Sequence, residues 1–250
     1  MITLNEAENL SACLASVADI AAEIVIVDGG SQDGTAAIAE KFGARVIVNP
    51  DWPGFGAQKN CALAHAREKW VLSLDADERI TPELLDEIHR IISAQDTEVV
   101  AYEIQRRSWF IGKFIKHTWS ADYVVRLCQR EHVRFTDDMV HERLIVDGRV
   151  ARLKSVMLHY SYRNYEQVLK KIDHYSTLSA QQAYARGKRA SIGTAVLHGW
   201  WAFMRSYFIR LGFLDGAYGL ALAISIAENS YYRYLKLSLL NNSKNNHSEK

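Results

Sequence analysis

The sequence predicts an α/β protein with a Rossmann-like, mixed but mainly parallel sheet, followed by a helical C-terminal extension. The first hundred residues alternate short apolar strands with helices at the spacing of βαβ units. From about residue 164 to 240 the chain instead becomes helical, aromatic and basic. A length of 250 residues, of which 48% are hydrophobic, is enough to bury a substantial core.

The N-terminal half contains four expected strands joined by helices. The strands are expected at residues 2–4, 23–27, 45–48 and 70–74. One helix is expected to be capped at Asn5 and another to end at Gly43. A further helix, after the last of these strands, is expected to start at Thr81-Pro82. Parallel strands connected in this way bring their carboxyl ends to one edge of the sheet, where such sheets bind ligands.

The second half of the chain has a different pattern. Strands are expected at residues 99–104, 123–128 and 144–150, and the last is interrupted by Asp147-Gly148, a type I′ hairpin signal. These segments predict antiparallel additions to the sheet. The polar composition of residues 241–250 predicts a disordered tail.

Composition excludes several classes of protein. With Lys+Arg 30 against Asp+Glu 29, there is no electrostatic basis for bulk nucleic-acid binding, and no nucleic-acid partner is expected. Cys13, Cys61 and Cys128 lack zinc-site spacing and are expected to be reduced packing residues. No signal peptide precedes the first expected strand, and no uncharged apolar run reaches the roughly 18 to 20 residues that span a bilayer. We therefore expect a cytoplasmic protein.

The most informative stretch is Asp75-Ala-Asp77, which follows the expected strand at 70–74. In an extended segment residues i and i+2 project to the same side, so both carboxylates can converge on one cation. Mg²⁺ and Mn²⁺ accept such oxygen ligands and keep positions open for phosphate. An Asp-x-Asp triplet occurs about once by chance in a chain of this length, so its context carries the argument.

Two glycine-containing turns supply that context. Residues 28–35 place the carboxylate of Asp28 at a strand end and glycines before a helix N-terminus, where backbone can approach an anionic ligand. A merely tight strand-to-helix turn also explains those glycines. Residues 54–60 form a second helix entrance, in which Lys59 can face either a phosphate or solvent.

Four motifs together resemble family 2 glycosyltransferases of the GT-A, or nucleotide-diphospho-sugar transferase, fold. They occur in the order and spacing of the family at residues 3–6, 27–35, 52–60 and 74–79. Further motifs resemble the bacterial lipopolysaccharide core β-1,4-glucosyltransferase group, and these lie at residues 140–142, 158–162 and 211–216. The resemblance extends over nearly the whole chain, to about residue 239.

The resemblance implies an inverting, metal-dependent sugar transfer. The expected donor is UDP-glucose, and the expected acceptor is the lipid-linked saccharide of the lipopolysaccharide inner core, at the cytoplasmic face of the bacterial inner membrane. Mg²⁺ or Mn²⁺ would be held by Asp75, Asp77 and His159, the last of which can equally be a core histidine. Glu142, with Asp138 next, is the expected base for the acceptor hydroxyl. The alternatives are a polyprenyl-phosphate sugar transferase and a non-catalytic membrane-surface scaffold with the same fold.

The resemblance also implies binding residues and domain limits. The nucleotide-sugar is expected to contact Thr3, Asn5, Glu6, Asp28, Gly30, Gln58, Lys59, Asn60, Asp75 and Ala76. The acceptor is expected to contact Arg106, Trp119 and Arg126. The expected domains are a GT-A domain at 1–163, with a nucleotide-sugar half at 1–105 and an acceptor half at 106–163, and a membrane-associating extension at 164–240.

Two features depart from the family pattern. Gly29 stands where the family often has a second Asp, which weakens any detailed assignment of contacts to the base. Met1 begins inside the first motif, so either the start is misassigned or the first strand is short.

Two segments keep alternative interpretations. Residues 106–119 interleave cations with aromatics, which suits nucleic acid, an anionic glycolipid acceptor or a packed amphipathic segment, and we favour the glycolipid. Residues 196–210 and 218–227 are apolar and aromatic with flanking Arg and Lys. They predict helices that lie in a membrane interface, or else a helical cap or a dimer interface.

Overall fold

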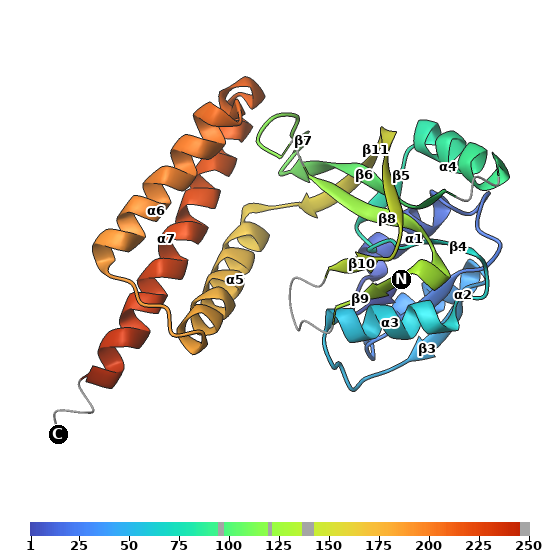
Figure 1. Cartoon of the computed structure of the whole chain (residues 1–250), viewed down its shortest axis with the longest axis horizontal. Helices are drawn as coiled ribbons and strands as arrows, with labels where there is room; N and C mark the ends of the chain where they lie inside the picture. The colour runs from blue at the N-terminus through green and yellow to red at the C-terminus, as the bar shows by residue number, and fades with distance from the viewer. Residues whose placement is uncertain (95–97, 120–121, 137–142, 246–250) are drawn as a thin grey trace. The chain divides into compact units, whose positions relative to one another are not determined.

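The computed structural model describes residues 1–94, 98–119, 122–136 and 143–245, with side chains to residue 241. The chain forms two compact units, whose elements are labelled in Figure 1. Unit 1 comprises Met1–Arg106 and Ala121–His159, and unit 2 comprises Arg107–Ser120 and Tyr160–Lys250. The domain limits expected from the sequence stay a prediction.

Unit 1 begins with a three-stranded parallel sheet in the order β1-β2-β3. Its elements are β1 (Ile2–Thr3), α1 (Ala7–Ala15), β2 (Val25–Asp28), α2 (Thr35–Lys41), β3 (Arg45–Val48) and α3 (Phe55–His65). The register pairs Thr3 with Asp28, which fixes the carboxyl end of β1 beside the end of β2.

A larger, six-stranded sheet runs in the order β4-β8-β6-β11-β5, with β7 paired to β6. Its strands and the helix after β5 are β4 (Trp70–Leu72), β5 (Glu78–Ile80), α4 (Pro82–Ala94), β6 (Val99–Phe110), β7 (Lys113–Phe114), β8 (Tyr123–Gln129) and β11 (Arg149–Tyr162). A separate antiparallel pair consists of β9 (Val133–Phe135) and β10 (Leu144–Val146).

The expected mixed α/β architecture with C-terminal helices is confirmed, but the expectation of a mainly parallel sheet is wrong. Among the described pairs, β4 with β8, β6 with β8, and β11 with β5 are all antiparallel. The expected fourth strand therefore belongs to a different sheet from the first three. Strand β4 belongs to the second sheet because it pairs with β8, which in turn pairs antiparallel with the long strand β6.

Three smaller expectations also fail. The Asp147-Gly148 turn is not a hairpin, because β10 pairs with β9 while β11 enters the six-stranded sheet. The N-cap position of helix α1 is Glu6, which makes no side-chain cap bond, and the Asn5 side chain accepts from the Gln32 amide instead. The helix at the C-terminus continues through Asn245, so the expected irregular tail does not start at residue 241.

The core of unit 1 includes residues of the larger sheet and of helix α4, which pack against each other. Thr81 Oγ1 accepts from the Leu84 amide at 3.3 Å, as expected for a helix start. Leu84 and Ile88, one helical turn apart, are fully buried among strand residues that include Ile104 and Leu127. This packing fixes the chain on both sides of the turn that contains Asp75 and Asp77.

Unit 2 is mainly helical. Its helices are α5 (Tyr165–Ala185), α6 (Ile192–Met204) and α7 (Ala217–Asn245), with a π-helical turn at Arg205–Ile209 and a 3-10 turn at Gly212–Asp215. Helix α7 packs against both α5 and α6. In the described part of the chain, none of the helices combines the length and apolarity required to cross a bilayer.

Asp215 joins the 3-10 turn of unit 2 to the segment after β7. Its carboxylate accepts from the backbone amides of Lys116, His117 and Thr118 at 3.0, 3.1 and 3.2 Å, and the residue is buried. Burial alone would raise the pKa of Asp215, but these hydrogen bonds outweigh it and lower the pKa below its usual range. Asp215 is therefore a structural carboxylate.

Candidate functional site

Asp28 holds the turn at the carboxyl end of β2. Its Oδ1 accepts from the amides of Gly30 and Ser31 at 3.0 and 2.7 Å, and its Oδ2 accepts from the hydroxyls of Ser31 and Thr3 at 2.6 and 2.7 Å. Gly30 adopts a φ of 90°, which brings its amide toward the carboxylate. Burial tends to raise the pKa of Asp28, but these donors lower it below its ordinary value. The turn is thus built around an ionised carboxylate.

The turn at Asp75–Asp77 differs from the extended geometry that the sequence predicts. Strand β4 ends at Leu72, and the Glu78 amide donates to the Asp75 carbonyl at 3.0 Å, which closes a turn over Ala76 and Asp77. The expectation that both carboxylates project from one face of a strand is therefore wrong. They face different partners.

The turn is attached to the parallel sheet by its middle residue. Ala76 is buried in a cluster with Ile26 of β2 and with Leu10 and Leu14 of α1. Arg79 strengthens this attachment, since its guanidinium donates to the carbonyls of Ala76 and Asn9, both at 2.7 Å. The carboxylates at Asp75 and Asp77 are consequently held at a fixed place relative to β2.

The Asp75 carboxylate lies between two cations. Lys59 Nζ is 3.0 Å from Oδ1, and an Arg126 guanidinium nitrogen is 2.5 Å from Oδ2. The Asp75 side chain is 34% exposed, whereas those of Lys59 and Arg126 are 7% and 6% exposed. Burial would raise the pKa of Asp75, but the two cations outweigh it and hold the pKa well below its usual range.

Arg126 also pairs with a second carboxylate, that of Glu78. The same nitrogen of Arg126 lies 2.5 Å from Glu78 Oε1, and Glu78 is fully buried. Arg106 extends the network, with one nitrogen 3.6 Å from Glu78 and a bidentate pair to Asp122 at 2.9 and 3.0 Å. Burial raises the pKa of Glu78, although Arg126 opposes that shift.

Asp77 faces His159 of β11. The β5–β11 register pairs His159 with Glu78, which places the imidazole next to the turn, and its Nε2 lies 3.3 Å from Asp77 Oδ2. Carboxylate oxygen and imidazole nitrogen are donors that suit Mn²⁺. Within the described residues, no three His, Cys, Asp or Glu side chains are grouped so that they could hold a metal ion. The three-residue metal site of Asp75, Asp77 and His159 stays a prediction.

Helix α3 carries the expected residues of the second helix entrance. Lys59 reaches Asp75, as described above. Gln58 exchanges side-chain bonds with Asn49, accepting at 2.7 Å and donating to its carbonyl at 3.0 Å. Asn60 brackets the backbone of Phe135, donating at 2.9 Å and accepting at 2.8 Å. Lys59 is therefore the member of this group that meets the aspartate turn, while Gln58 and Asn60 brace the surrounding strands.

The remaining expected residues lie in three places. Asn5, with a φ of 56°, and Glu6 hydrogen-bond to the turn after β2, to Ser31 and Thr35 respectively. Trp119 belongs to unit 2, where it stacks on Tyr162 with ring centroids 6.1 Å apart. The expected bases, Glu142 and Asp138, lie outside the described residues.

Two residues of the site carried no expected role. Glu78 follows the Asp-x-Asp triplet directly, and its complete burial beside Arg126 and Arg106 could not be read from a charged residue in a polar stretch. Ser31 supplies two of the bonds to Asp28. A serine three residues after a strand-end aspartate is the usual signal of such a turn.

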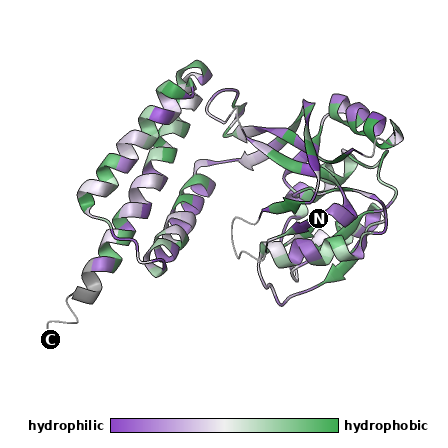
Figure 2. Ribbon diagram, in the orientation of Figure 1, coloured by the Kyte–Doolittle hydropathy of each residue, from purple (hydrophilic) through white to green (hydrophobic). Residues whose placement is uncertain are grey.

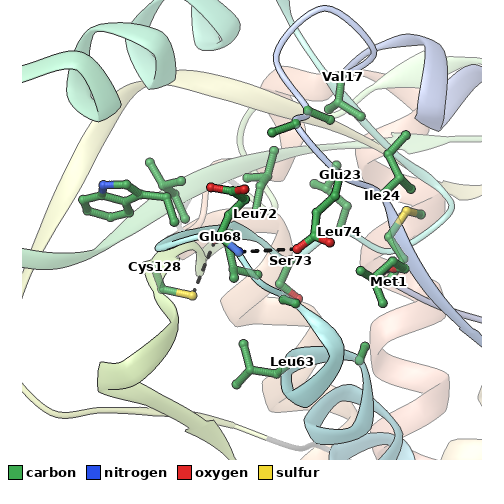
Figure 3. Close-up of a pocket in the computed structure, with 18 of the residues that line it drawn as sticks. Met1, Val17, Glu23, Ile24, Leu63, Glu68, Leu72, Ser73, Leu74 and Cys128 are labelled. Atoms are coloured by element: carbon green, nitrogen blue, oxygen red, sulfur yellow. Dashed lines mark hydrogen bonds between the residues drawn. The ribbon is translucent and has the colours of Figure 1, made fainter. Parts of the chain in front are cut away.

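A cavity of about 350 Å³ lies in unit 1 beside the aspartate turn (Figure 3). Its lining is mostly apolar and comes largely from the segment between α1 and β2, from α3, from β4 and from β8. Members labelled in Figure 3 include Met1, Ile24, Leu63, Leu72 and Leu74. The polar groups that hold Asp28 are not part of this lining, so the cavity is separate from that turn.

Comparisons with known proteins point to one family. A family model described as Glycosyl transferase family 2 matches residues 1–154. An uncharacterized glycosyltransferase of Rickettsia conorii is 31% identical over 261 residues, covering 97% of this chain and 89% of the relative. The lipopolysaccharide core biosynthesis glycosyltransferase LpsC of Rhizobium meliloti is 30% identical over 253 residues, covering 94% of this chain and 91% of LpsC.

Solved structures are more distant. The structure of TarS 1-349 from S. aureus has a TM-score of 0.48 and 16% identity, covering 96% of this chain and 90% of TarS. Glucosyl-3-phosphoglycerate synthase from Mycobacterium tuberculosis, in complex with Mn²⁺, UDP and glucosyl-3-phosphoglycerate, has a TM-score of 0.36 and 22% identity, with 42% of each chain covered. At these TM-scores neither structure supports an argument about the site.

Proposed function

Because the chain belongs to glycosyl transferase family 2, we propose that it transfers glucose from UDP-glucose to the inner core of lipopolysaccharide. The observation that carries the proposal is the relation to LpsC along almost the full length of both chains. Residues 1–105 would bind the donor, residues 106–163 the acceptor, and residues 164–240 a membrane.

The donor site is proposed at Asp28, Lys59 and Asp75. Asp28 would shape the turn after β2 against which the nucleoside lies, since the amides of Gly30 and Ser31 already donate to its carboxylate. Lys59 is already buried and paired with Asp75. It could therefore pair with a phosphate oxygen in place of Asp75 with no further cost of desolvation. Thr3, Asn5, Glu6, Gly30, Gln58, Asn60 and Ala76 would form or brace the walls of this site.

Asp77, His159 and Asp75 are proposed to hold Mg²⁺ or Mn²⁺. The donor atoms of Asp77 and His159 fit such an ion, whereas Asp75 would first have to exchange the cations that it now contacts. When bound, the ion supplies positive charge that stabilises the departing nucleoside diphosphate.

The transfer is proposed to be a single displacement with inversion. The acceptor hydroxyl oxygen forms the new bond to C1 of the sugar as the bond from C1 to the UDP oxygen breaks. The hydroxyl proton passes to a carboxylate, for which we propose Glu142, with Asp138 as the second candidate. Glu142→Gln should lower kcat by about 10² to 10⁴ with little change in UDP affinity. If Glu142→Gln leaves kcat unchanged and Asp138→Asn lowers it strongly, Asp138 is the base instead.

LpsC supports the proposed acceptor, because its name assigns it to lipopolysaccharide core biosynthesis. We further propose that the enzyme acts on a lipid-linked core saccharide as a peripheral protein at the cytoplasmic face of the inner membrane. Arg106, Trp119 and Arg126 were the expected acceptor contacts. Arg126 is better suited to hold Asp75, since its guanidinium is buried between Asp75 and Glu78. Arg106, in unit 1, stays a proposed acceptor contact, and the expectation for Trp119, in unit 2, stays a prediction from the resemblance.

The donor is tested by a panel of UDP-, ADP- and GDP-glucose with Mn²⁺ or Mg²⁺, measuring the release of nucleoside diphosphate by the full chain. We expect the fastest release from UDP-glucose and its loss on addition of EDTA. Faster release from ADP- or GDP-glucose would refute the donor. The acceptor is tested by adding a lipopolysaccharide core acceptor or a polyprenyl phosphate, and product formed only on the latter would establish the alternative transferase. Failure of every donor with both acceptors would leave a non-catalytic scaffold and refute the proposal.

A further inference from the structure

Helix α6 in unit 2 exposes its large apolar side chains and buries its small ones. Ala195 and Gly199 are buried. A Cβ added at Gly199 would lie 3.0 Å from the Tyr231 Cβ and 3.3 Å from the Ala227 carbonyl oxygen, so this side contacts α7 closely. The side chains that are more than half exposed are those of Ile192, Val196, Leu197, Trp200 and Trp201. This is the reverse of the pattern of a helix that is covered only by its own fold.

The exposed apolar surface continues beyond the end of α6. Five further large apolar residues, each between 44% and 62% exposed, are Phe208, Ile209, Leu211, Phe213 and Leu214. Figure 2 shows hydrophobic stretches of α6 in green, interrupted by white and purple ones. We call these ten residues the α6 apolar face. An exposed apolar surface of this kind on a protein of average composition marks an interaction site.

The charged side chains in the segment that carries the α6 apolar face all have the same sign. Between Asp173 and Asp215 the sequence contains no Asp or Glu, and its Lys and Arg residues are Arg186, Lys188, Arg189, Arg205 and Arg210. All five are exposed, whereas Asp215 is buried. Along this segment, cations therefore precede and follow the apolar residues, and no exposed Asp or Glu lies among them.

We propose that the α6 apolar face binds the surface of an anionic lipid bilayer, with α6 lying in the plane of the membrane. The apolar side chains would enter the boundary between headgroups and acyl chains, where Trp is favoured, and the five cations would contact lipid phosphates. The described helices include none that could span instead. This inference rests on the proposed membrane role of residues 164–240 and deepens it, but it concerns unit 2 alone and does not depend on the identity of the donor or the acceptor.

A second copy of the chain is a poorer occupant than a bilayer. In a two-fold symmetric dimer the same patch contacts itself, so the cations that flank the face would approach those of the second copy. The pKa of Arg210 is lowered, first by its partial burial and second by the positive charge of Arg205. The two arginines therefore already lie close to each other. Anionic lipids would neutralise such a group of cations, whereas a dimer would add to their repulsion.

The proposal is tested by flotation of the full chain with vesicles of phosphatidylcholine alone or mixed with phosphatidylglycerol. We expect flotation with the anionic vesicles that weakens as salt is raised, since screening reduces contacts to lipid phosphates. Leu197→Glu and Trp200→Glu should each lower the bound fraction by at least about tenfold, because an apolar side chain leaves the interface and a like charge enters it. The matched control is Leu169→Glu on α5, since Leu169 is also exposed and apolar but lies outside the α6 apolar face.

Each outcome supports or refutes the proposal. Loss of flotation in the two α6 variants, with retention in Leu169→Glu and with unchanged far-UV circular dichroism, supports it. Equal flotation of all variants, or none with wild type, refutes it. Sedimentation of wild type as a dimer that Leu197→Glu dissociates, without vesicle binding, would establish a second copy as the occupant. Donor turnover in detergent is predicted to be the same for Leu197→Glu and wild type, which separates this test from that of the proposed reaction.

Discussion

Arg126 is the residue on which the geometry of the aspartate turn depends most. It contacts Asp75 and the fully buried Glu78 at 2.5 Å each. Removing one member of a buried charge network leaves the others desolvated without compensation, which costs more than the pair itself contributes. The contact between Arg106 and Glu78, at 3.6 Å, is too long for Arg106 to replace Arg126 fully.

Arg126→Leu is therefore expected to lower the free energy of unfolding by about 3 kcal/mol at pH 7. The measurement is urea denaturation followed by circular dichroism. Arg149→Leu is the matched control, because Arg149 pairs with Glu98 at 2.8 Å with its own side chain 67% exposed. The control should lose no more than about 0.5 kcal/mol. Equal losses in the two variants would contradict the buried network.

Asp28 gives a pH-dependent prediction. Its folded pKa is lowered, so its contribution to stability is present above the ordinary Asp pKa of about 3.9 and is lost as pH falls through the folded value. Asp28→Asn should lower the free energy of unfolding by about 1 to 3 kcal/mol at pH 7, since an amide replaces a carboxylate that accepts four hydrogen bonds. Denaturation of both proteins from pH 7 down to about pH 3 should show the difference shrinking below pH 4. A difference that grows toward acid pH would reverse the assigned sign.

Local chemistry at single residues could be predicted from the sequence, but their partners could not. The strand-end position of Asp28 and the helix entrance at Lys59 follow from spacing along the chain. The contacts of Asp75 depend on Lys59 and Arg126, which come from distant positions in the sequence. Likewise, the burial of Glu78 depends on strands that pair with β5 only after the chain has folded.

Among the elements, strand direction is where the sequence pattern misleads. Short apolar runs separated by helices predict parallel pairing, and this holds for β1, β2 and β3. Strand β4 has the same apolar pattern, but its edge pairs antiparallel with β8. Hydrophobic periodicity reports burial and does not report the identity of the neighbouring strand, so the sheet order could not be predicted from it.

The contact between α6 and α7 gives a prediction at this scale. Gly199→Val should destabilise unit 2 by about 1 to 3 kcal/mol, because its added atoms meet Tyr231 and the backbone of α7. Gly193→Val is the control for the cost of a β-branched residue in the same helix, since a Cβ at Gly193 meets only Ser191 Oγ, at 3.6 Å. The melting temperatures of the two variants provide the comparison. If Gly193→Val melts as low as Gly199→Val, close packing at Gly199 is not the cause.

For the whole molecule, the residues divide their tasks between the two units. The carboxylates, Lys59 and His159 that we assign to the donor and metal all belong to unit 1. The α6 apolar face and its cations belong to unit 2. The family relationship and the helical extension could be predicted from sequence, because motif order and composition suffice for both. The orientation of α6, with its small residues toward α7, required the structure.

The central claim is that the aspartate turn of unit 1 is the catalytic donor site of a glycosyltransferase. The most direct measurement is the initial rate of UDP release from UDP-glucose with Mn²⁺, compared between wild type and Asp77→Ala proteins of equal melting temperature. The Asp77 side chain is 24% exposed, whereas Glu78 is fully buried and Arg126 6% exposed, so replacing Asp77 should be tolerated by the fold. We predict a loss of at least about a hundredfold, a few kcal/mol of barrier. Full turnover by Asp77→Ala would contradict the account.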